Sequence, residues 1–156
     1  MKFDKTIVDA KLFTELQDLA SVLSKVPDLE FDYQFGHYIN LKDRKISASH
    51  FWDYYEENER LSGYKTDVWL RALGTMTQTN LKDFKDMQIF IDETPIPNFA
   101  SELFTLLEDL RLEEYIRNKR RGTIQTFRTR SRAYRRYFNT QLQTNVTRNY
   151  PTDELF

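Results

Sequence analysis

Apolar residues near the start of the chain recur with the spacing of a helix. Four leucines stand three or four positions apart and form the centre of this stripe: Leu12, Leu16, Leu19 and Leu23. Such spacing gathers apolar side chains on one face of a helix. Pro27 interrupts the pattern, because proline lacks the amide hydrogen that a continuing helix needs. The pattern predicts an amphipathic helix over residues 9–25.

The spacing changes to two over the following segment. From residue 29 to residue 41, thirteen positions alternate between a mostly apolar and a mostly polar set, which is typical of a β-strand. Residues 46–52 alternate again after the polar sequence KDRK. The pattern therefore predicts one long antiparallel hairpin over residues 29–52.

The register of this hairpin depends on its turn. A tight turn centred on Asp43 and Arg44 would place four pairs of side chains opposite each other. These pairs are Leu41 with Ile46, Ile39 with Ala48, His37 with His50, and Phe35 with Trp52. A three-residue loop would shift the register by one and turn one histidine to the other face of the sheet.

Helical spacing returns in the second half of the chain. Residues 53–65 have no clean period and are predicted to form a partly packed loop, whereas Thr66 can cap a helix that begins the helical part, residues 66–145. A short helix is expected over residues 80–93, before two prolines.

Two long helices are predicted at the end of this part. The first follows Asn98 and carries five apolar residues at core spacing: Phe99, Leu103, Leu106, Leu107 and Leu110. Gly122 lies where a terminating glycine is expected, and Thr123 can cap the last helix. We expect the two helices to pack as an antiparallel pair. The fold class is thus α+β and mainly helical: one long antiparallel hairpin packed with about four to five helices, in a single domain over residues 1–156.

Composition fits this picture and excludes several classes of protein. The 156 residues are 40% apolar and 15% aromatic, enough for one sizeable core. Four glycines and no spaced-glycine motif exclude a phosphate-binding loop. The absence of cysteine excludes disulfides and sulfur-ligated metals and fits a cytoplasmic protein. Charges interrupt the first ten residues and no apolar window of about 18 residues occurs, so neither export nor a membrane span is expected.

The net charge of −1 conceals an uneven distribution of charge along the chain. Residues 1–110 hold 12 basic and 20 acidic side chains, whereas residues 111–156 hold 11 and 4. On the predicted last helix, four arginines fall on the side opposite the apolar stripe: Arg128, Arg132, Arg135 and Arg136. These arginines can be neutralised by the acidic part of the chain, by an acidic protein partner, or by nucleic-acid phosphates. The sequence pI near 6.2 favours the first two.

Candidate chemistry is sparse. His37 and His50 could share a divalent metal ion with a carboxylate, as in metal-dependent hydrolases, if the hairpin brings them together. No HExxH spacing is present, and no serine lies in a nucleophile elbow. Half-buried histidines on an apolar strand are usually packing residues. No catalytic residue is therefore predicted, and a metal-dependent hydrolase remains only an alternative.

Acidic residues interrupt the apolar face of the long helix. Glu108 lies one helical turn before Arg111, so the two side chains can pair. Asp109 and Glu113 lie four residues apart on an adjacent strip of the helix surface. Polar groups on a core-facing helix need partners. We therefore expect an arginine–carboxylate network in which arginines across the helix pair are the natural partners.

This stretch resembles a known family. The sequence SELFTLLEDLRLEEYIRNKRRGTIQTF is similar to the segment ahead of the von Willebrand A domain in nitric-oxide-reductase-activation proteins and cobaltochelatase-T-like proteins. The resemblance covers roughly residues 99–145 and rests on an E-D-x-R-[IL]-E motif followed by a basic patch and a glycine: Glu108, Asp109, Arg111, Leu112, Glu113 and Gly122.

The resemblance implies that the chain is the N-terminal region of a larger cytoplasmic protein. Such proteins are thought to act with MoxR-type AAA+ ATPases as adaptors in metal insertion or in maturation of a target complex. The metal-binding motif DxSxS of an A domain does not occur here, so a magnesium site is expected only downstream and no cofactor is expected in this chain. A non-enzymatic interaction module is the first hypothesis, and a nucleic-acid-binding helical module is the second.

Overall fold

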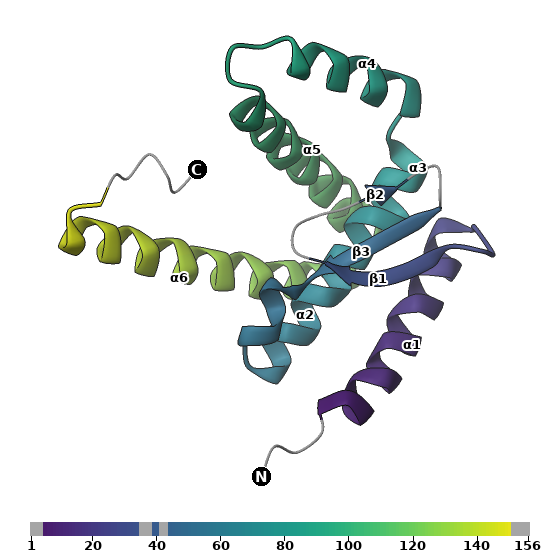
Figure 1. Ribbon diagram of the computed structural model, residues 1–156. Coiled ribbons are helices and arrows are strands. Elements are labelled where there is room, and N and C mark those ends of the chain that lie inside the picture. The colour runs from purple at the N-terminus through teal and green to yellow at the C-terminus, as the bar shows by residue number, and fades with distance from the viewer. Residues whose placement is uncertain (1–4, 35–38, 41–43, 151–156) are drawn as a thin grey trace.

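The computed structural model describes residues 5–34, 39–40 and 44–150 (Figure 1). The elements follow one another as α1 (Lys5–Ser24), β1 (Glu30–Gln34), β2 (Ile39–Asn40), β3 (Lys45–Ser49), a 3₁₀ turn η1 (His50–Tyr54), α2 (Glu57–Val68), a π-helix η2 (Trp69–Thr75), α3 (Met76–Gln78), α4 (Leu81–Asp92), α5 (Pro97–Lys119), η3 (Arg121–Thr123) and α6 (Ile124–Arg148). The prediction of a mainly helical α+β fold is confirmed.

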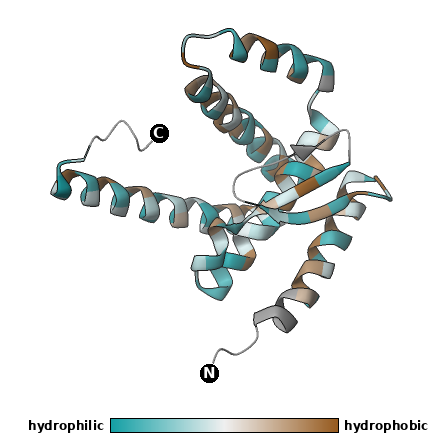
Figure 2. Cartoon of the chain, in the orientation of Figure 1, coloured by the Kyte–Doolittle hydropathy of each residue, from teal (hydrophilic) through white to brown (hydrophobic). Residues whose placement is uncertain are grey.

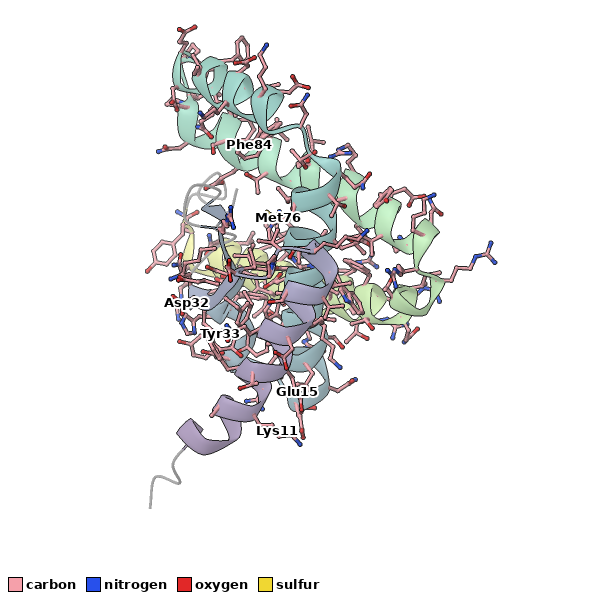
Figure 3. All side chains as sticks on the ribbon, turned by 90° about the vertical axis from the view of Figure 1, so that its right-hand side faces the viewer. Lys11, Glu15, Asp32, Tyr33, Met76 and Phe84 are labelled. Carbon is pink, nitrogen blue, oxygen red and sulfur yellow. The ribbon has the colours of Figure 1, made fainter. Side chains whose placement is uncertain are left out.

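The helix α1 has the predicted amphipathic character. Leu16 and Ala20 are buried against Phe31 of β1 and Ile46 of β3. The helix ends at Ser24, where Lys25 takes a left-handed conformation with φ of 59°. Its other face is exposed, as the charged pair Lys11 and Glu15 shows (Figure 3).

The predicted antiparallel hairpin is wrong. The sheet has the order β1-β3-β2, with β1 parallel to β3 and Phe31 opposite Ile46. Only the two-residue β2 runs antiparallel to β3, and it sets Ile39 opposite Ile46 instead of Ala48. Alternation fixes which side chains share a face, but it carries no information about the direction of the neighbouring strand.

The remaining predicted pairs are also absent or lie outside the described residues. Ala48 is opposite Tyr33 in the parallel ladder, and Trp52 belongs to η1 instead of a strand. The pairings of Phe35, His37 and Leu41 involve residues outside the part of the chain that the structure describes.

The segment predicted as a loop, residues 53–65, is mostly helical. Trp52 is fully buried against α2, and a Cβ atom at Gly63 would lie 1.9 Å from its ring. Thr66 is inside α2 instead of capping a helix, and its hydroxyl donates to the Ser62 carbonyl at 2.8 Å. The helix continues directly into η2, where Leu70 is buried. Because α2 packs with small and polar residues, its sequence shows no apolar period.

The last two helices do not form the predicted antiparallel pair. From the turn η3 they diverge as two arms: α6 packs on α2 near its start, whereas α5 packs on η2 and on α4 (Figure 1). Phe84 of α4 contacts Phe104 of α5 with ring centroids 5.6 Å apart. Close to the turn, a second small core joins the arms: Leu70, Leu112, Ile116 and Phe127. Among the described residues, no helix combines the length and the apolar character needed to cross a bilayer.

The apolar residues of α5 that were expected in the core are exposed instead. Their exposed fractions run from 42% to 56%: Phe99, Leu103, Leu106, Leu107 and Leu110. Ile89 and Phe90 of α4 are exposed as well, and Figure 2 shows apolar positions along the ribbons of α4 and α5. The sequence pattern thus identified an apolar helix face correctly, but no element of the described chain covers it.

Candidate interaction groove

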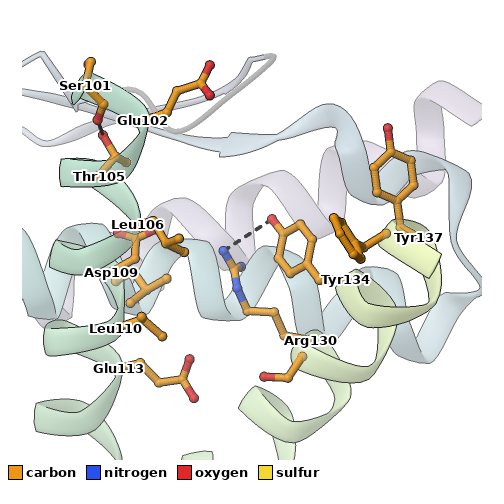
Figure 4. Close-up of a pocket in the computed structure, with 13 residues that line it drawn as sticks. Ser101, Glu102, Thr105, Leu106, Asp109, Leu110, Glu113, Arg130, Tyr134 and Tyr137 are labelled. Atoms are coloured by element: carbon orange, nitrogen blue, oxygen red, sulfur yellow. Dashed lines mark hydrogen bonds between the residues drawn. The ribbon is translucent and has the colours of Figure 1, made fainter. Parts of the chain in front are cut away.

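The two diverging arms enclose a groove of about 770 Å³ (Figure 4). Seven residues of α5 line one wall: Ser101, Glu102, Thr105, Leu106, Asp109, Leu110 and Glu113. Five residues of α6 line the other wall: Arg130, Ser131, Tyr134, Tyr137 and Phe138. Leu70 of η2 completes the lining, and its near-complete burial places it at the base.

A buried ion pair anchors α6 at the base of this groove. The Arg130 guanidinium, on a residue only 6% exposed, donates to the carboxylate of Asp67 and, at 2.9 Å, to the Thr66 hydroxyl. Asp67 is fully buried and also accepts hydrogen bonds from the Ser49 amide and the Trp52 indole, both at 2.9 Å. Because each partner comes from a different element, these contacts tie β3, η1, α2 and α6 together. We call Asp67, Arg130 and Trp52 the polar hub.

Aromatic rings surround the guanidinium of the polar hub. The Cζ atom of Arg130 lies 5.2 Å from the Trp52 ring centroid and 5.0 Å from that of Tyr134, distances typical of cation–π contacts. The Tyr134 hydroxyl accepts a hydrogen bond from Arg130 at 3.5 Å (Figure 4). A buried charge pair is tolerated when hydrogen bonds satisfy both partners, which is the arrangement here.

Two of the groups that line the groove, Arg130 and Tyr134, keep a fixed charge state near neutral pH. Burial acts to lower the pKa of Arg130, but the charge and hydrogen bond of Asp67, together with Tyr134 and Asp109, outweigh it and raise that pKa above its ordinary value. Burial raises the pKa of Tyr134 to about 12, against a smaller opposing effect of Arg130. Arg130 is therefore a permanent cation and Tyr134 a neutral phenol.

A second ion pair fixes α5 to η2. Arg71 of η2 donates through Nη2 to both carboxylate oxygens of Asp109, at 2.6 and 2.8 Å. The partner of Asp109 is thus an arginine of η2 and not, as expected, an arginine of α6. Gly74 permits the close approach of the two elements, since a Cβ atom there would lie 3.1 Å from Leu112.

The other acidic residues of the motif pair within α5. The Arg111 guanidinium donates to both carboxylate oxygens of Glu108 at 2.7 Å, and the Thr79 hydroxyl donates to the same carboxylate at 2.5 Å. The hydrogen bond from Arg111 holds the pKa of Glu108 below its ordinary value. Arg117 contacts Glu113 at 3.4 Å, while burial raises the pKa of Glu113.

The structure places all four predicted arginines of α6 on its exposed surface. Arg136 pairs with Glu59 of α2 at 2.6 Å and lies over the Tyr55 ring at 5.7 Å. For the other three, no carboxylate of the described residues lies within ion-pair distance: Arg128, Arg132 and Arg135. We call these three residues the arginine rim. Among the described residues, an acidic side chain of the chain therefore pairs with Arg136 but with none of the three arginines of the rim.

The predicted histidine site is not assembled in the described part of the chain. His50 lies in η1, where its Nδ1 atom is 2.8 Å from the Asp53 carboxylate and its ring packs on Tyr33. His37 is outside the described residues. Within the residues that the structure does describe, no three His, Cys, Asp or Glu side chains gather as a metal site would require.

Sequence reasoning missed the polar hub and Arg71. The sequence TDVWLRA places Asp67 and Arg71 inside an otherwise apolar run. Charged residues in such a run are costly to bury unless they are paired, and this signal was available. Nothing in the sequence distinguishes Arg130 from the neighbouring arginines or marks a partner 63 residues away.

Comparisons with known proteins give one informative match. No family model matches the chain, and no solved structure matches it. The chain is similar to the uncharacterized protein YojO of Bacillus subtilis (strain 168), with 39% identity over 157 aligned positions that cover 100% of this chain and 24% of the relative. The chain therefore spans about a quarter of the length of this relative.

Proposed function

We propose that this chain is a non-enzymatic interaction module of a larger protein of the von Willebrand A type. In this proposal the module acts with a MoxR-type AAA+ ATPase in metal insertion or in maturation of a target complex. The family resemblance of residues 99–145 suggests the partner. The match to about a quarter of a longer relative supports a role within a larger protein.

One observation carries the interaction role. The apolar face of α5 is about half exposed beside a groove whose other wall is aromatic. Contiguous exposed apolar surface of this kind is typical of interaction sites in folded proteins. Arg130 and Asp109 at the groove already have structural partners, which favours binding over catalysis.

Retention of the ATPase on the immobilised chain tests this proposal. A MoxR-type ATPase from the same genome is offered without nucleotide, with ADP and with a non-hydrolysable ATP analogue. We expect retention in at least one state, and an AAA+ ATPase of another clade serves as the control. Absence of retention in all three states contradicts the proposal.

Binding of nucleic acid is a second candidate, favoured by the arginine rim, which has no ion pair to any carboxylate that the structure describes. Phosphate contacts release counterions, so the affinity for a duplex oligonucleotide should fall steeply with added salt. The triple variant R128A/R132A/R135A should reduce both the affinity and its salt dependence. Undetectable binding at low ionic strength removes this candidate.

A further inference from the structure

The exposed apolar residues of α5 repeat with the spacing of a coiled-coil seam. Four of them follow one another at steps of four, three and four residues, and we call them the α5 stripe: Phe99, Leu103, Leu106 and Leu110. An average step of about 3.5 residues is the spacing at which one helix packs lengthwise along another. The helix α6 diverges from α5 and leaves this seam open (Figure 1).

The α5 stripe is continuous with the groove. Leu106 and Leu110 belong to both, and they face Tyr134, Tyr137 and Phe138 across the opening. A cylinder about 10 Å across with a pitch of about 5.4 Å describes an α-helix, so roughly two helical turns fill a volume of this size. The groove volume of about 770 Å³ therefore matches about two turns of a single helix.

Charge distinguishes the two sides of the site. Arg128 and Arg135 lie about one helical turn on either side of Ser131, which lines the groove, so these two residues of the arginine rim border its α6 wall. The α5 wall carries acidic side chains instead: Glu102, Asp109 and Glu113. An occupant that complements both walls presents carboxylates toward α6.

We propose that the groove and the α5 stripe bind one amphipathic helix of a partner protein. Its apolar residues, spaced by about 3.5, pack on the α5 stripe, and its Asp or Glu side chains on one flank meet the arginine rim. This inference rests on the proposed function, in that the partner is a protein, and it adds the chemistry by which that partner is recognised. The charged rim sets the orientation of the helix and speeds its association.

A second copy of this chain fits the site less well. Its own α5 would be the helix offered, but two of the acidic groups beside that stripe are already paired. Asp109 is held by Arg71, and Glu113 contacts Arg117. Such a dimer would leave much of the arginine rim without a counter-charge.

The test uses two fluorescein-labelled peptides of 21 residues with the same leucine seam. One carries glutamates on a single flank, and the other carries lysines at the same positions. By fluorescence anisotropy at low salt, the acidic peptide should bind at least about tenfold more tightly, as expected for a few exposed charge pairs. The variant R128E/R132E/R135E should reverse this preference.

Variants of the apolar surface complete the test. The variant L106D/L110D should lose binding of both peptides, because it places charges on the shared seam. Val22→Asp is the matched control, since Val22 is an exposed apolar residue on α1, 75% exposed, far from the groove in sequence. Circular dichroism confirms that each variant is folded.

Three outcomes overturn the inference. Equal affinity for the two peptides would remove the role of the arginine rim. A dimer in light scattering that L106D/L110D dissociates would identify a second copy as the occupant. Displacement of the acidic peptide by a duplex oligonucleotide from the wild type, but not from a protein lacking the rim charges, would identify nucleic acid.

The test separates this inference from the proposed function. If the ATPase is retained equally by the wild type and by L106D/L110D, the inference fails while the proposed function stands. If the peptides behave as expected and no nucleotide state retains the ATPase, the proposed function fails while the groove remains a helix-binding site.

Discussion

The body of the molecule and its two arms use similar residues in opposite ways. In the body, formed by α1, the sheet, α2 and η2, even charged residues are buried, as Asp67 and Arg71 show. In the arms, leucines such as Leu103 and Leu106 are about half exposed. Residue type therefore does not decide burial here. The body is stabilised by its buried apolar and charged contacts, whereas the arms leave apolar surface exposed.

Removal of Asp67 should have the largest effect on this comparison, because it destabilises the body. Asp67→Ala leaves the Arg130 guanidinium buried without its counter-charge and the Ser49 amide without its acceptor. We expect a loss of about 3–5 kcal/mol in the free energy of unfolding, measured by urea denaturation. Asp67→Asn, which keeps an acceptor oxygen but no charge, should be intermediate. A loss below about 1 kcal/mol would show that the polar hub does not stabilise the body.

Two leucines on the same helix compare the regions directly. Leu112 of α5 is fully buried near the turn, whereas Leu106 is 56% exposed. Leu112→Ala should cost about 2–5 kcal/mol, and Leu106→Ala about 0.5 kcal/mol or less, both by urea denaturation. Similar costs for the two variants would mean that the α5 stripe is covered in solution.

Two glycines sharpen the comparison further. A Cβ atom at Gly63 would overlap the Trp52 ring, whereas a Cβ atom at Gly122 meets nothing within 4 Å. Gly63→Ala should lower the free energy of unfolding by about 1–3 kcal/mol, and Gly122→Ala should leave it within about 0.5 kcal/mol. Thermal denaturation measures both, and a neutral Gly63→Ala would contradict the close packing of Trp52.

Acid should weaken the attachment of α5 by a smaller amount. Since Arg111 lowers the pKa of Glu108 in the folded state, the contribution of this pair is present above the ordinary glutamate pKa of about 4.3. It is lost as pH falls through the lowered pKa. The effect should stay below about 1 kcal/mol because the Arg111 side chain is half exposed and solvent screens the pair. Glu108→Gln should reduce the slope of stability against pH in this range, and an unchanged slope would contradict the assignment.

What the sequence predicted well depends on geometry within one element. The stripe of α1 and the exposed arginines of α6 follow from helical periodicity alone. The helix over residues 80–93 is confirmed as α4, where Asn80 caps the first turn by accepting a hydrogen bond from the Lys82 amide at 3.0 Å. Local caps of this kind need only neighbouring residues.

What the sequence did not predict depends on partners that are distant along the chain. The alternation of residues 29–41 could not show that β1 would lie parallel to β3. The apolar face of α5 indicates a helix with a packing partner, but nothing in the sequence shows that α6, the next helix along the chain, is not that partner. The contacts at the base of the groove could not be predicted for the same reason, because Arg71 and Asp109 are 38 residues apart in the sequence.

The attachment of α6 has a mechanical consequence. Its buried residues are Phe127, Arg130 and Ala133, all within the first ten positions of a 25-residue helix. Contacts with the rest of the molecule extend at least to Tyr137, whose ring centroid lies 5.2 Å from that of Phe51, and the helix continues for eleven more residues, about 16 Å at 1.5 Å per residue. A force applied at the C-terminal end of α6 therefore acts through a long lever arm on the buried ion pair between Arg130 and Asp67 near its start.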